Sequence, residues 1–365
     1  MTLVLTVIFV ALVFEYINGF HDTANSIATV VSTKVLTPRQ AVILAACMNL
    51  IGAMIGTAVA KTISSGLVDA KIVALGSDVI ICALCGAIVW NLATWWLGLP
   101  SSSSHALIGG LCGSALAAAH NNWHVIIWSQ PNAEHWFLGK GLLWKVVVPM
   151  LVSPFLGLVL GFIVMGLLYF FLQNKRPLRV NRFFGVAQIF SAGGMGIMHG
   201  TNDAQKTMGI IALALVGATK AGQFENLPDW LSFLHTAPPL PGKDLEIALW
   251  IKVTCALIMA AGTAAGGWRI IRTLVHKMVK LHPINGFAAE ASSASVIWIA
   301  THLGIPVSTT HNISAAIMGV GAAKRFNAIK WTVVERMVWA WILTIPVSGL
   351  IAYGLVRLIR VLGWV

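Results

Sequence analysis

Two acidic residues lie in the middle of long apolar stretches of this 365-residue chain, each within a short element that occurs twice. Residues 19–26 read Gly-Phe-His-Asp-Thr-Ala-Asn-Ser, and residues 200–207 read Gly-Thr-Asn-Asp-Ala-Gln-Lys-Thr. Asp22 and Asp203 therefore occupy the same point of the two copies. A carboxylate inside a membrane costs about 3 kcal/mol or more unless a proton or a cation accompanies it. The pair predicts two acids that couple to cations or protons, although capping a helix is the simpler role for either residue.

A second repeated element combines proline, small hydroxyl side chains and histidine. Residues 97–105 read Leu-Gly-Leu-Pro-Ser-Ser-Ser-Ser-His, and residues 303–311 read Leu-Gly-Ile-Pro-Val-Ser-Thr-Thr-His. Proline suits the first turn of a helix and Ser or Thr its cap, so each copy predicts a helix start. Free N–H groups at a helix start suit a tetrahedral oxyanion, and hydroxyls add donors. The hydroxyl candidates are Ser102, Ser103, Ser104, Ser308, Thr309 and Thr310. Close helix packing is the alternative use of such small residues.

Charged and titratable residues near these elements suggest coupling. Two carboxylates beside an anion site repel the anion until cations or protons neutralise them, so the two ligands would favour each other's binding. Lys206 could add a fixed positive charge or extend towards the membrane surface. Glu290 is a candidate third coupling acid, although a helix start would also favour it. Two histidines are expected to line the site and two others stay without an assigned role, namely His105 and His311, and His21 and His199.

The composition indicates which elements must position these residues. Hydrophobic residues make up 58% of the chain and charged residues 10%, with a mean hydropathy of +0.83. A soluble domain carries about 25% charged residues. Uncharged stretches long enough to span a bilayer recur without the alternation of barrel strands, so we expect an all-α polytopic membrane protein with about 10–12 transmembrane segments. The predicted crossings are residues 1–33, 40–60, 79–99, 101–119, 142–172, 183–219, 246–267, 284–304, 306–322 and 331–356.

The order of the repeated elements divides the chain into two halves, residues 1–172 and 183–365. The linker, residues 173–182, contains four basic residues and is predicted to be cytoplasmic. An odd number of crossings in each half makes the halves inverted repeats. The stretches that contain Asp22 and Asp203 are longer than one span, so each is predicted to be a broken helix. The Pro- and Ser-started segments are predicted to be hairpin helices.

Several functional classes are disfavoured. The net charge of +12 comes from basic residues dispersed over short loops, which indicates membrane orientation rather than nucleic-acid binding. Cys82 and Cys85 form a C-x-x-C inside an apolar segment without partner ligands, so packing is the expected role, and neither a cofactor nor a structural metal is predicted. A serine hydrolase built on Ser104 and His105 is disfavoured because neighbouring residues on one helix do not face each other. We expect no enzyme activity.

The pairs GFHDTAN with GTNDAQK and LPSSSSH with IPVSTTH resemble the inorganic phosphate transporter family, and look closest to its bacterial low-affinity members. The resemblance covers essentially the whole chain. It implies a homodimer in the bacterial inner membrane that imports phosphate in symport with protons or sodium. Bacterial members similar to this chain are associated with neutral metal–phosphate complexes and with protons. By the resemblance, Asp22, Asn25, Asp203 and Lys206 fall in the signature loops of the family, and the two hydroxyl runs fall at the hairpin helix starts. The residues expected to bind phosphate are Asn25, Ser26, Lys206, Thr207, His105, His311 and the two hydroxyl runs.

Two positions depart from the family pattern. Many members repeat Asn where this chain has Lys206, and many carry Glu where it has Asn49, which favours protons over a full complement of sodium ions. Another oxyanion such as sulfate is the alternative cargo. Monohydrogen phosphate can donate a hydrogen bond to a carboxylate and sulfate cannot, so the repeated acids favour phosphate. A channel would accommodate the same acids, and concentrative, saturable uptake would distinguish a transporter from it.

Overall fold

The chain folds almost entirely into α-helices. The computed structural model describes residues 1–69, 72, 75–130, 139–225, 228–236, 246–273 and 281–363. Among these residues no strand forms beyond two isolated bridges, which join Val68 to Ile126 and Gln130 to Lys140. The helices are α1 (Thr2–Ser32), α2 (Pro38–Ala53), α3 (Ala58–Ser65), α4 (Ser77–Leu97), α5 (Ser103–Ala118), α6 (Val148–Leu172), α7 (Pro177–Lys220), α8 (Leu249–Ala265), α9 (Trp268–Arg272), α10 (Pro283–His302), α11 (Thr309–Lys324) and α12 (Trp331–Val361).

The predicted crossings coincide with these helices, most of them with a single helix each. Four described helices are long and apolar enough to cross a membrane by length and composition alone: Thr2–Ser32, Ser77–Leu97, Leu143–Leu172 and Trp331–Val361. The third of these begins with a π-helical turn, Leu143–Val147, that leads directly into α6. The architecture is that of an all-α, multi-pass membrane protein.

One predicted crossing, residues 40–60, is divided into two helices. Helix α2 ends at Ala53 and α3 begins at Ala58. The amide side chain of Gln205 on α7 accepts a hydrogen bond from Val59 N at 2.8 Å and donates one to Ile55 O at 3.2 Å. Gln205 therefore satisfies backbone groups that the helix end leaves without partners.

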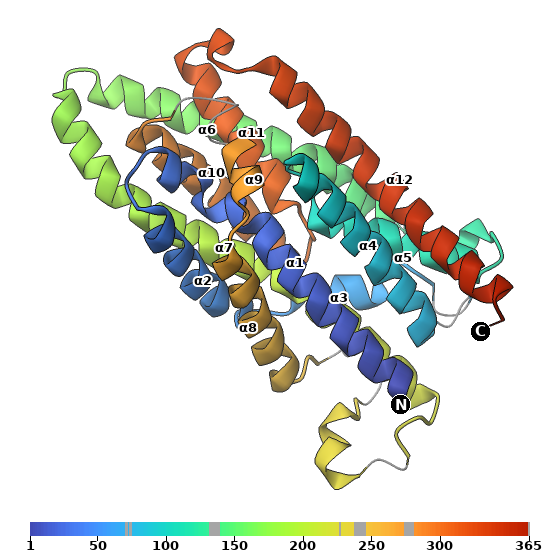
Figure 1. Ribbon diagram of the computed structural model, residues 1–365. Coiled ribbons are helices and arrows are strands. Elements are labelled where there is room, and N and C mark those ends of the chain that lie inside the picture. The colour runs from blue at the N-terminus through green and yellow to red at the C-terminus, as the bar shows by residue number, and fades with distance from the viewer. Residues whose placement is uncertain are drawn as a thin grey trace.

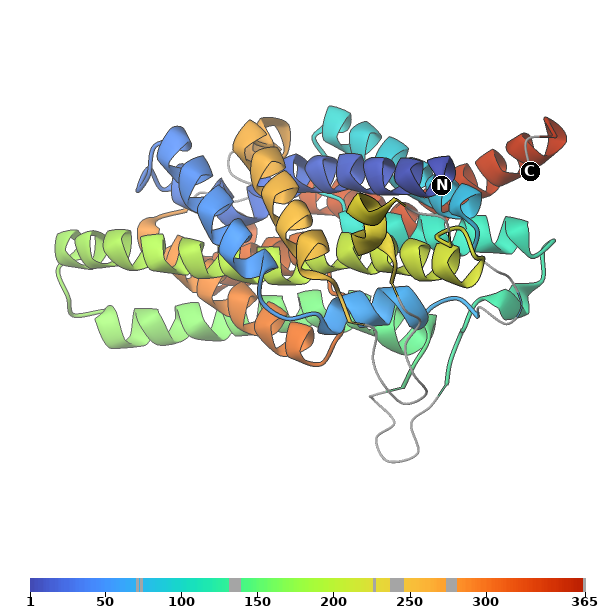
Figure 2. The ribbon, with the colours of Figure 1, turned by 90° about the horizontal axis from the view of Figure 1, so that it is seen from below.

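The interruptions predicted at Asp22 and Asp203 are absent from the structure. Helices α1 and α7 run through these residues without a break, over 31 and 44 residues. Neither helix contains an internal proline, and Thr23 and Thr201 return their hydroxyls to carbonyls four residues earlier. Hydroxyl groups of other helices donate hydrogen bonds to the side chains of Asp22 and Asp203. The backbone of α1 and α7 therefore keeps its helical hydrogen bonds at these residues. At 1.5 Å per residue α7 is about 66 Å long, and Figure 2 shows it running the length of the molecule.

The two halves pack through reciprocal helix pairs. Helix α6 of the first half packs on α11 of the second, and α12 of the second half packs on α5 of the first. The same exchange pairs α1 with α8 and α2 with α7. Glycines allow the backbones to approach closely, as at Gly113 of α5 against Gly349 of α12 and at Gly319 of α11 against Leu158 of α6. Small residues at such contacts are what helix association in a membrane requires.

The chain ends and the turn between the halves lie at opposite ends of the molecule. The N- and C-termini lie at one end in Figure 1, and the turn from α6 to α7 lies at the other. That turn, Gln173–Arg176, is shorter than the predicted linker because α7 already begins at Pro177.

Candidate functional site

The two aspartates lie together in the interior, on neighbouring helices. Asp22 on α1 is 2% exposed and Asp203 on α7 is 1% exposed, and the two helices pack against each other. The starts of α5 and α11 reach both carboxylates, because hydroxyls from each helix donate to them. The two Pro- and Ser-started elements therefore meet beside the two acids.

The carboxylate of Asp22 accepts hydrogen bonds from both halves of the chain. Ser103 Oγ of its own half donates to Oδ2 at 3.1 Å, and Thr310 Oγ1 of the other half donates to Oδ1 at 3.4 Å. His21 Nδ1 lies 2.6 Å from Oδ1. The second ring nitrogen of His21 is 3.2 Å from Thr94 Oγ1, so α4 orients the imidazole.

The carboxylate of Asp203 has a matching environment and one additional partner. Thr309 Oγ1 of its own half donates to Oδ2 at 2.8 Å, and Ser104 Oγ of the other half donates to Oδ1 at 3.5 Å. His199 Nε2 lies 3.0 Å from Oδ2. The additional partner is Lys206, whose ammonium forms an ion pair with Oδ1.

Two turns of the same geometry deliver these hydroxyls. Gly98 and Gly304 follow the ends of α4 and α10, with φ of +66° and +62°, a left-handed conformation that glycine adopts without strain. After each glycine, Ser101 N bonds to Leu99 O and Val307 N bonds to Ile305 O, both at 2.9 Å around the proline. The repeated Leu-Gly-x-Pro sequence therefore encodes one local fold twice.

The hydroxyls that directly follow these turns cap the two helices. Ser102 Oγ accepts from His105 N at 3.2 Å, and Ser308 Oγ accepts from His311 N at 3.1 Å. Their lone pairs are used by the helix, which stabilises each start by about 1 kcal/mol. Of the two predicted hydroxyl runs, the last two residues of each run reach the carboxylates, and the first fixes the helix start.

Helices α4 and α5 with the turn between them form the first hairpin, and α10 and α11 with their turn form the second. Asn25 connects the first acidic element to the second hairpin. Its Nδ2 donates to Thr309 Oγ1 at 3.1 Å and to Thr310 Oγ1 at 2.9 Å. Its Oδ1 and the hydroxyl of Ser26 are buried and without a hydrogen-bond partner among the described residues. Both atoms are thus available to a ligand at this point of the structure.

The predicted site histidines form a pair beside the hairpins. The rings of His105 and His311 lie 4.9 Å apart, edge to face, and His311 stacks on Trp341 at 4.2 Å. Trp341 Nε1 donates to Pro100 O at 3.0 Å, which ties the pair to the first hairpin. Nδ1 of both histidines has no partner among the described residues.

Two predicted site residues lie in separate clusters. Thr207 donates its hydroxyl to Glu15, one turn further along α7 from Asp203. Glu290 accepts hydrogen bonds from Thr29 and Ser191, and from Gln188 Nε2 at 3.4 Å. Thr29 is seven residues from Asp22, about 10 Å along α1. Glu290 is therefore a further buried acid with its own hydroxyl and amide partners, and not a member of the aspartate cluster.

Asp22, His199 and Asp203 could together hold a cation. One ligand atom from each of them lies within 4.8 Å of the others. Two carboxylates in this cluster face one ammonium, which leaves one negative charge without a fixed counter-charge when both acids are ionised and the histidines are neutral. In a membrane interior such a charge requires a cation or a proton.

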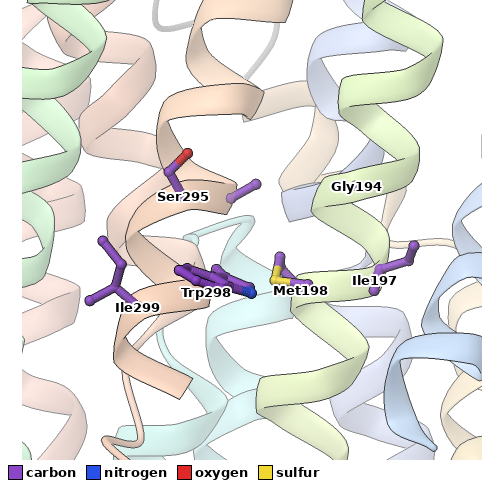
Figure 3. Close-up of a pocket in the computed structure, with 7 residues that line it drawn as sticks. Gly194, Ile197, Met198, Ser295, Trp298 and Ile299 are labelled. Atoms are coloured by element: carbon purple, nitrogen blue, oxygen red, sulfur yellow. The ribbon is translucent and has the colours of Figure 1, made fainter. Parts of the chain in front are cut away.

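An apolar groove on the surface is distinct from this site. It has a volume of about 440 Å³ and lies between α7 and α10 (Figure 3), lined by Gly194, Ile197, Met198, Ala294, Ser295, Trp298 and Ile299. Its one hydroxyl, Ser295 Oγ, already donates to Ala291 O at 2.9 Å. The groove presents no charged side chain and does not suit an anion.

The geometry agrees with comparisons to known proteins. The model of the "Phosphate transporter family" matches residues 18–352. The chain belongs to this family. It is 43% identical over 362 residues to a "probable low-affinity inorganic phosphate transporter" of Bacillus subtilis (strain 168), covering 98% of both chains. A protein of the same description from Mycobacterium tuberculosis (strain ATCC 25618 / H37Rv) is 43% identical over 98% of this chain and 78% of its own length.

A solved structure shows the same fold. The chain titled "The sodium-dependent phosphate transporter" superposes with a TM-score of 0.75, at 22% identity, over 99% of this chain and 100% of that one. The family, its bacterial relatives and the apolar helices identify a multi-pass protein of the bacterial inner membrane. The predicted family membership and the predicted all-α, multi-pass membrane fold are confirmed, whereas the broken helices that were part of that prediction are absent.

Sequence reasoning left some of the site's polar residues without a role. His21 and His199 lie against the two aspartates, at positions one and four residues before them. A histidine at i−4 lies on the same helix face as the aspartate, so this spacing was a usable signal for His199. Asn49 holds the other ring nitrogen of His199, with Oδ1 3.1 Å from Nδ1, and no local pattern predicts that contact between helices.

Proposed function

We propose that the chain imports inorganic phosphate, free or as a metal–phosphate complex, in symport with protons or Na⁺. One observation carries the proposal: hydroxyl donors from two opposed helix starts converge on two buried aspartates. Phosphate accepts hydrogen bonds from hydroxyls and N–H groups, and its protonated form donates to a carboxylate. The relatives' names supply the cargo, and the donor set suits it.

The donors and the acids support coupling between the two ligands. The hydroxyls of Ser103, Ser104, Thr309 and Thr310 donate to carboxylates. A phosphate that takes these donors leaves Asp22 and Asp203 less well solvated, so a cation or proton must bind the acids at the same time. Each ligand then raises the affinity for the other, which is the thermodynamic requirement of symport.

Alternating access calls for two related halves. We infer that residues 1–172 and 183–365 are inverted repeats joined at residues 173–182. The exchange of partners supports this: each aspartate binds one hydroxyl of its own half and one of the other, and the helix pairs α6–α11 and α5–α12 follow the same exchange. A substrate site at a repeat interface is the usual arrangement in such transporters. A homodimer follows only from the family resemblance.

A transport role suits Ser104 and His105 better than hydrolysis. Ser104 Oγ donates to Asp203, and the ring of His105 faces His311. The serine therefore has no histidine base in the hydrogen-bond position that nucleophilic catalysis requires. The relatives are likewise described as transporters.

Radiolabelled phosphate uptake into proteoliposomes tests the proposal, with a proton gradient and a sodium gradient imposed separately. We expect uptake above the equilibrium concentration under one of the two gradients and loss of accumulation in Asp22→Asn. Uptake with the proton gradient alone would identify protons as the coupling ion. Movement of sulfate in place of phosphate, or passive equilibration under both gradients, would contradict the assignment.

A further inference from the structure

Lys206 has the surroundings of a bound cation. Its side chain is buried, at 2% exposure, and its ammonium contacts Asp203 Oδ1, Ser104 Oγ and Val307 O, the last at 3.2 Å. A carboxylate, a hydroxyl and a backbone carbonyl are the oxygen ligands that hold hard cations in proteins. An ammonium has three protons. All three have acceptors here, so Lys206 has no proton left for a phosphate ion.

The first repeat shows what the same position looks like without the charge. Asn25 stands where the second repeat has Lys206, and both side chains donate to the last residue of the opposite hydroxyl run, Thr310 and Ser104 respectively. Asp22 has hydroxyl and imidazole partners, and no lysine or arginine of the described part of the chain bonds to it. The Asp22 half-site consists of Asp22 with its two hydroxyl donors, and the Asp203 half-site consists of Asp203 with its two. Their oxygen ligands match, and among the described residues only the Asp203 half-site contains a lysine, Lys206.

We propose that the Lys206 ammonium permanently occupies the place of a coupling cation at Asp203, so that each cycle carries one cation or proton fewer than a site with Asn at both positions. This inference rests on the proposed function, since it concerns how many ions accompany phosphate. A tethered ammonium cannot leave with the cargo. It keeps Asp203 neutralised throughout the cycle, and Asp22 becomes the aspartate that exchanges a mobile ion.

The variant Lys206→Asn tests this by copying the residue of the first repeat into the second. Its Asp203 needs a mobile cation or proton, so one more positive charge should move with each phosphate. With pH and Na⁺ equal on both sides of a proteoliposome, a membrane potential of about 60 mV, inside negative, multiplies accumulation about tenfold for each charge moved. We expect the variant to accumulate about tenfold more phosphate at equilibrium than the unchanged protein at that potential.

A matched control makes the same exchange elsewhere on the same helix. Lys220 is exposed at the C-terminal end of α7, so Lys220→Asn should accumulate phosphate as the unchanged protein does. An equal charge per phosphate in Lys206→Asn and in the unchanged protein would overturn the inference. Failure of the unchanged protein to accumulate phosphate under any gradient would instead count against the proposed function.

A second measurement covers the case in which Lys206→Asn does not transport. Thermal unfolding of the purified variant in NaCl, LiCl and choline chloride, at two pH values, reports whether Asp203 has acquired a mobile counter-ion. We expect Na⁺, Li⁺ or the lower pH to raise its Tm by more than they raise the Tm of the unchanged protein, in which only Asp22 takes a mobile ion, and no such additional rise in the double variant Asp203→Asn/Lys206→Asn. A Tm of Lys206→Asn that follows the unchanged protein under all conditions would overturn the inference.

Discussion

The Asp22 half-site and the Asp203 half-site share their scaffold and differ in their charge. In both, a carboxylate on a long helix accepts one hydroxyl from the hairpin of its own half and one from the hairpin of the other. Equivalent Leu-Gly-x-Pro turns place those hydroxyls. The shape of the site is therefore repeated, including the exchange of partners between the halves.

The difference lies in the position three residues after each aspartate. Asn25 leaves Asp22 with polar partners, whereas Lys206 gives Asp203 a permanent counter-charge. The histidines that contact the two aspartates also differ in sequence position. His21 directly precedes Asp22, whereas His199 precedes Asp203 by one helical turn. A duplicated scaffold can thus keep its geometry while one substitution divides the roles, with one acid held neutral and the other free to exchange an ion.

The largest effects are expected from removing either carboxylate. Asp22→Asn should reduce phosphate accumulation by about 100-fold or more, because it removes the acid that exchanges the coupling ion. Asp203→Asn should also reduce it strongly, because the Lys206 ammonium then stays in the site without its counter-charge. Their stabilities should differ. Asp203→Asn leaves the Lys206 ammonium buried without its partner and should lower the free energy of unfolding by about 3 kcal/mol. Asp22→Asn removes no fixed charge pair and should cost about 1 kcal/mol.

Thermal unfolding and uptake on the same purified preparations check both statements. Equal Tm values for the two variants would contradict the proposed charge difference between the Asp22 and Asp203 half-sites. Normal phosphate uptake by both variants would contradict the assignment of the two aspartates to the transport site.

The glycines that open the two acidic elements should behave alike, because they serve shape and not charge. A Cβ on Gly19 would meet the backbone of α8 at Met259 and Thr263, and one on Gly200 would meet the backbone of α2 at Asn49. Each Gly→Ala change should cost about 1–3 kcal/mol by overpacking. Gly194, also on α7, has nothing within 4 Å of such a Cβ and is the matched control. A tolerated Gly200→Ala beside a destabilising Gly19→Ala would show that the two halves pack differently.

The smallest effects are expected at two basic side chains, Arg269 and Lys145, that donate to backbone carbonyls at the ends of α4 and α10. We call them the anchors of the first and the second hairpin, and they differ in their contacts. Arg269 Nη1 donates to Trp96 O at 2.9 Å, and its guanidinium lies 4.9 Å and 4.6 Å from the rings of Trp95 and Trp96. On the other hairpin, Lys145 Nζ makes one 3.3 Å bond to Leu303 O. Arg269→Ala should cost about 1–2 kcal/mol, because it removes cation–π contacts and a charge-assisted bond. Lys145→Ala should cost below about 0.5 kcal/mol.

Tm values of the purified variants decide between these two anchors. Arg269→Lys serves as the charge-preserving control and should recover only part of the loss, since an ammonium does not stack as a guanidinium does. A larger loss in Lys145→Ala than in Arg269→Ala would reverse the expected order of the two anchors.

Much of the site could be predicted because it is built from short sequence motifs, each of which occurs twice in the chain. The repeated motifs and apolar stretches were enough to predict most of the helices and an anion site with its hydroxyl donors beside Asp22 and Asp203. The uninterrupted α1 and α7 could not be predicted in this way. Whether polar residues open a helix depends on whether facing helices supply their partners, and those partners are distant in sequence. For the same reason the split of residues 40–60 was missed, because Gln205 lies about 150 residues away.

The reciprocal packing of the halves has a consequence for biosynthesis. Helix α5 carries Ser103 and Ser104, and the helix that covers it, α12, follows α5 and α11 in the chain and leaves the ribosome after them. Helix α6 likewise packs against a helix that is synthesised later, α11. All the polar residues of the aspartate cluster have therefore been synthesised before the element that closes over half of them. A chain truncated before Trp331 would insert with every ligand present and with Gly109 and Gly113 facing lipid instead of α12. Synthesis of α12 is therefore the step that completes the packing around α5.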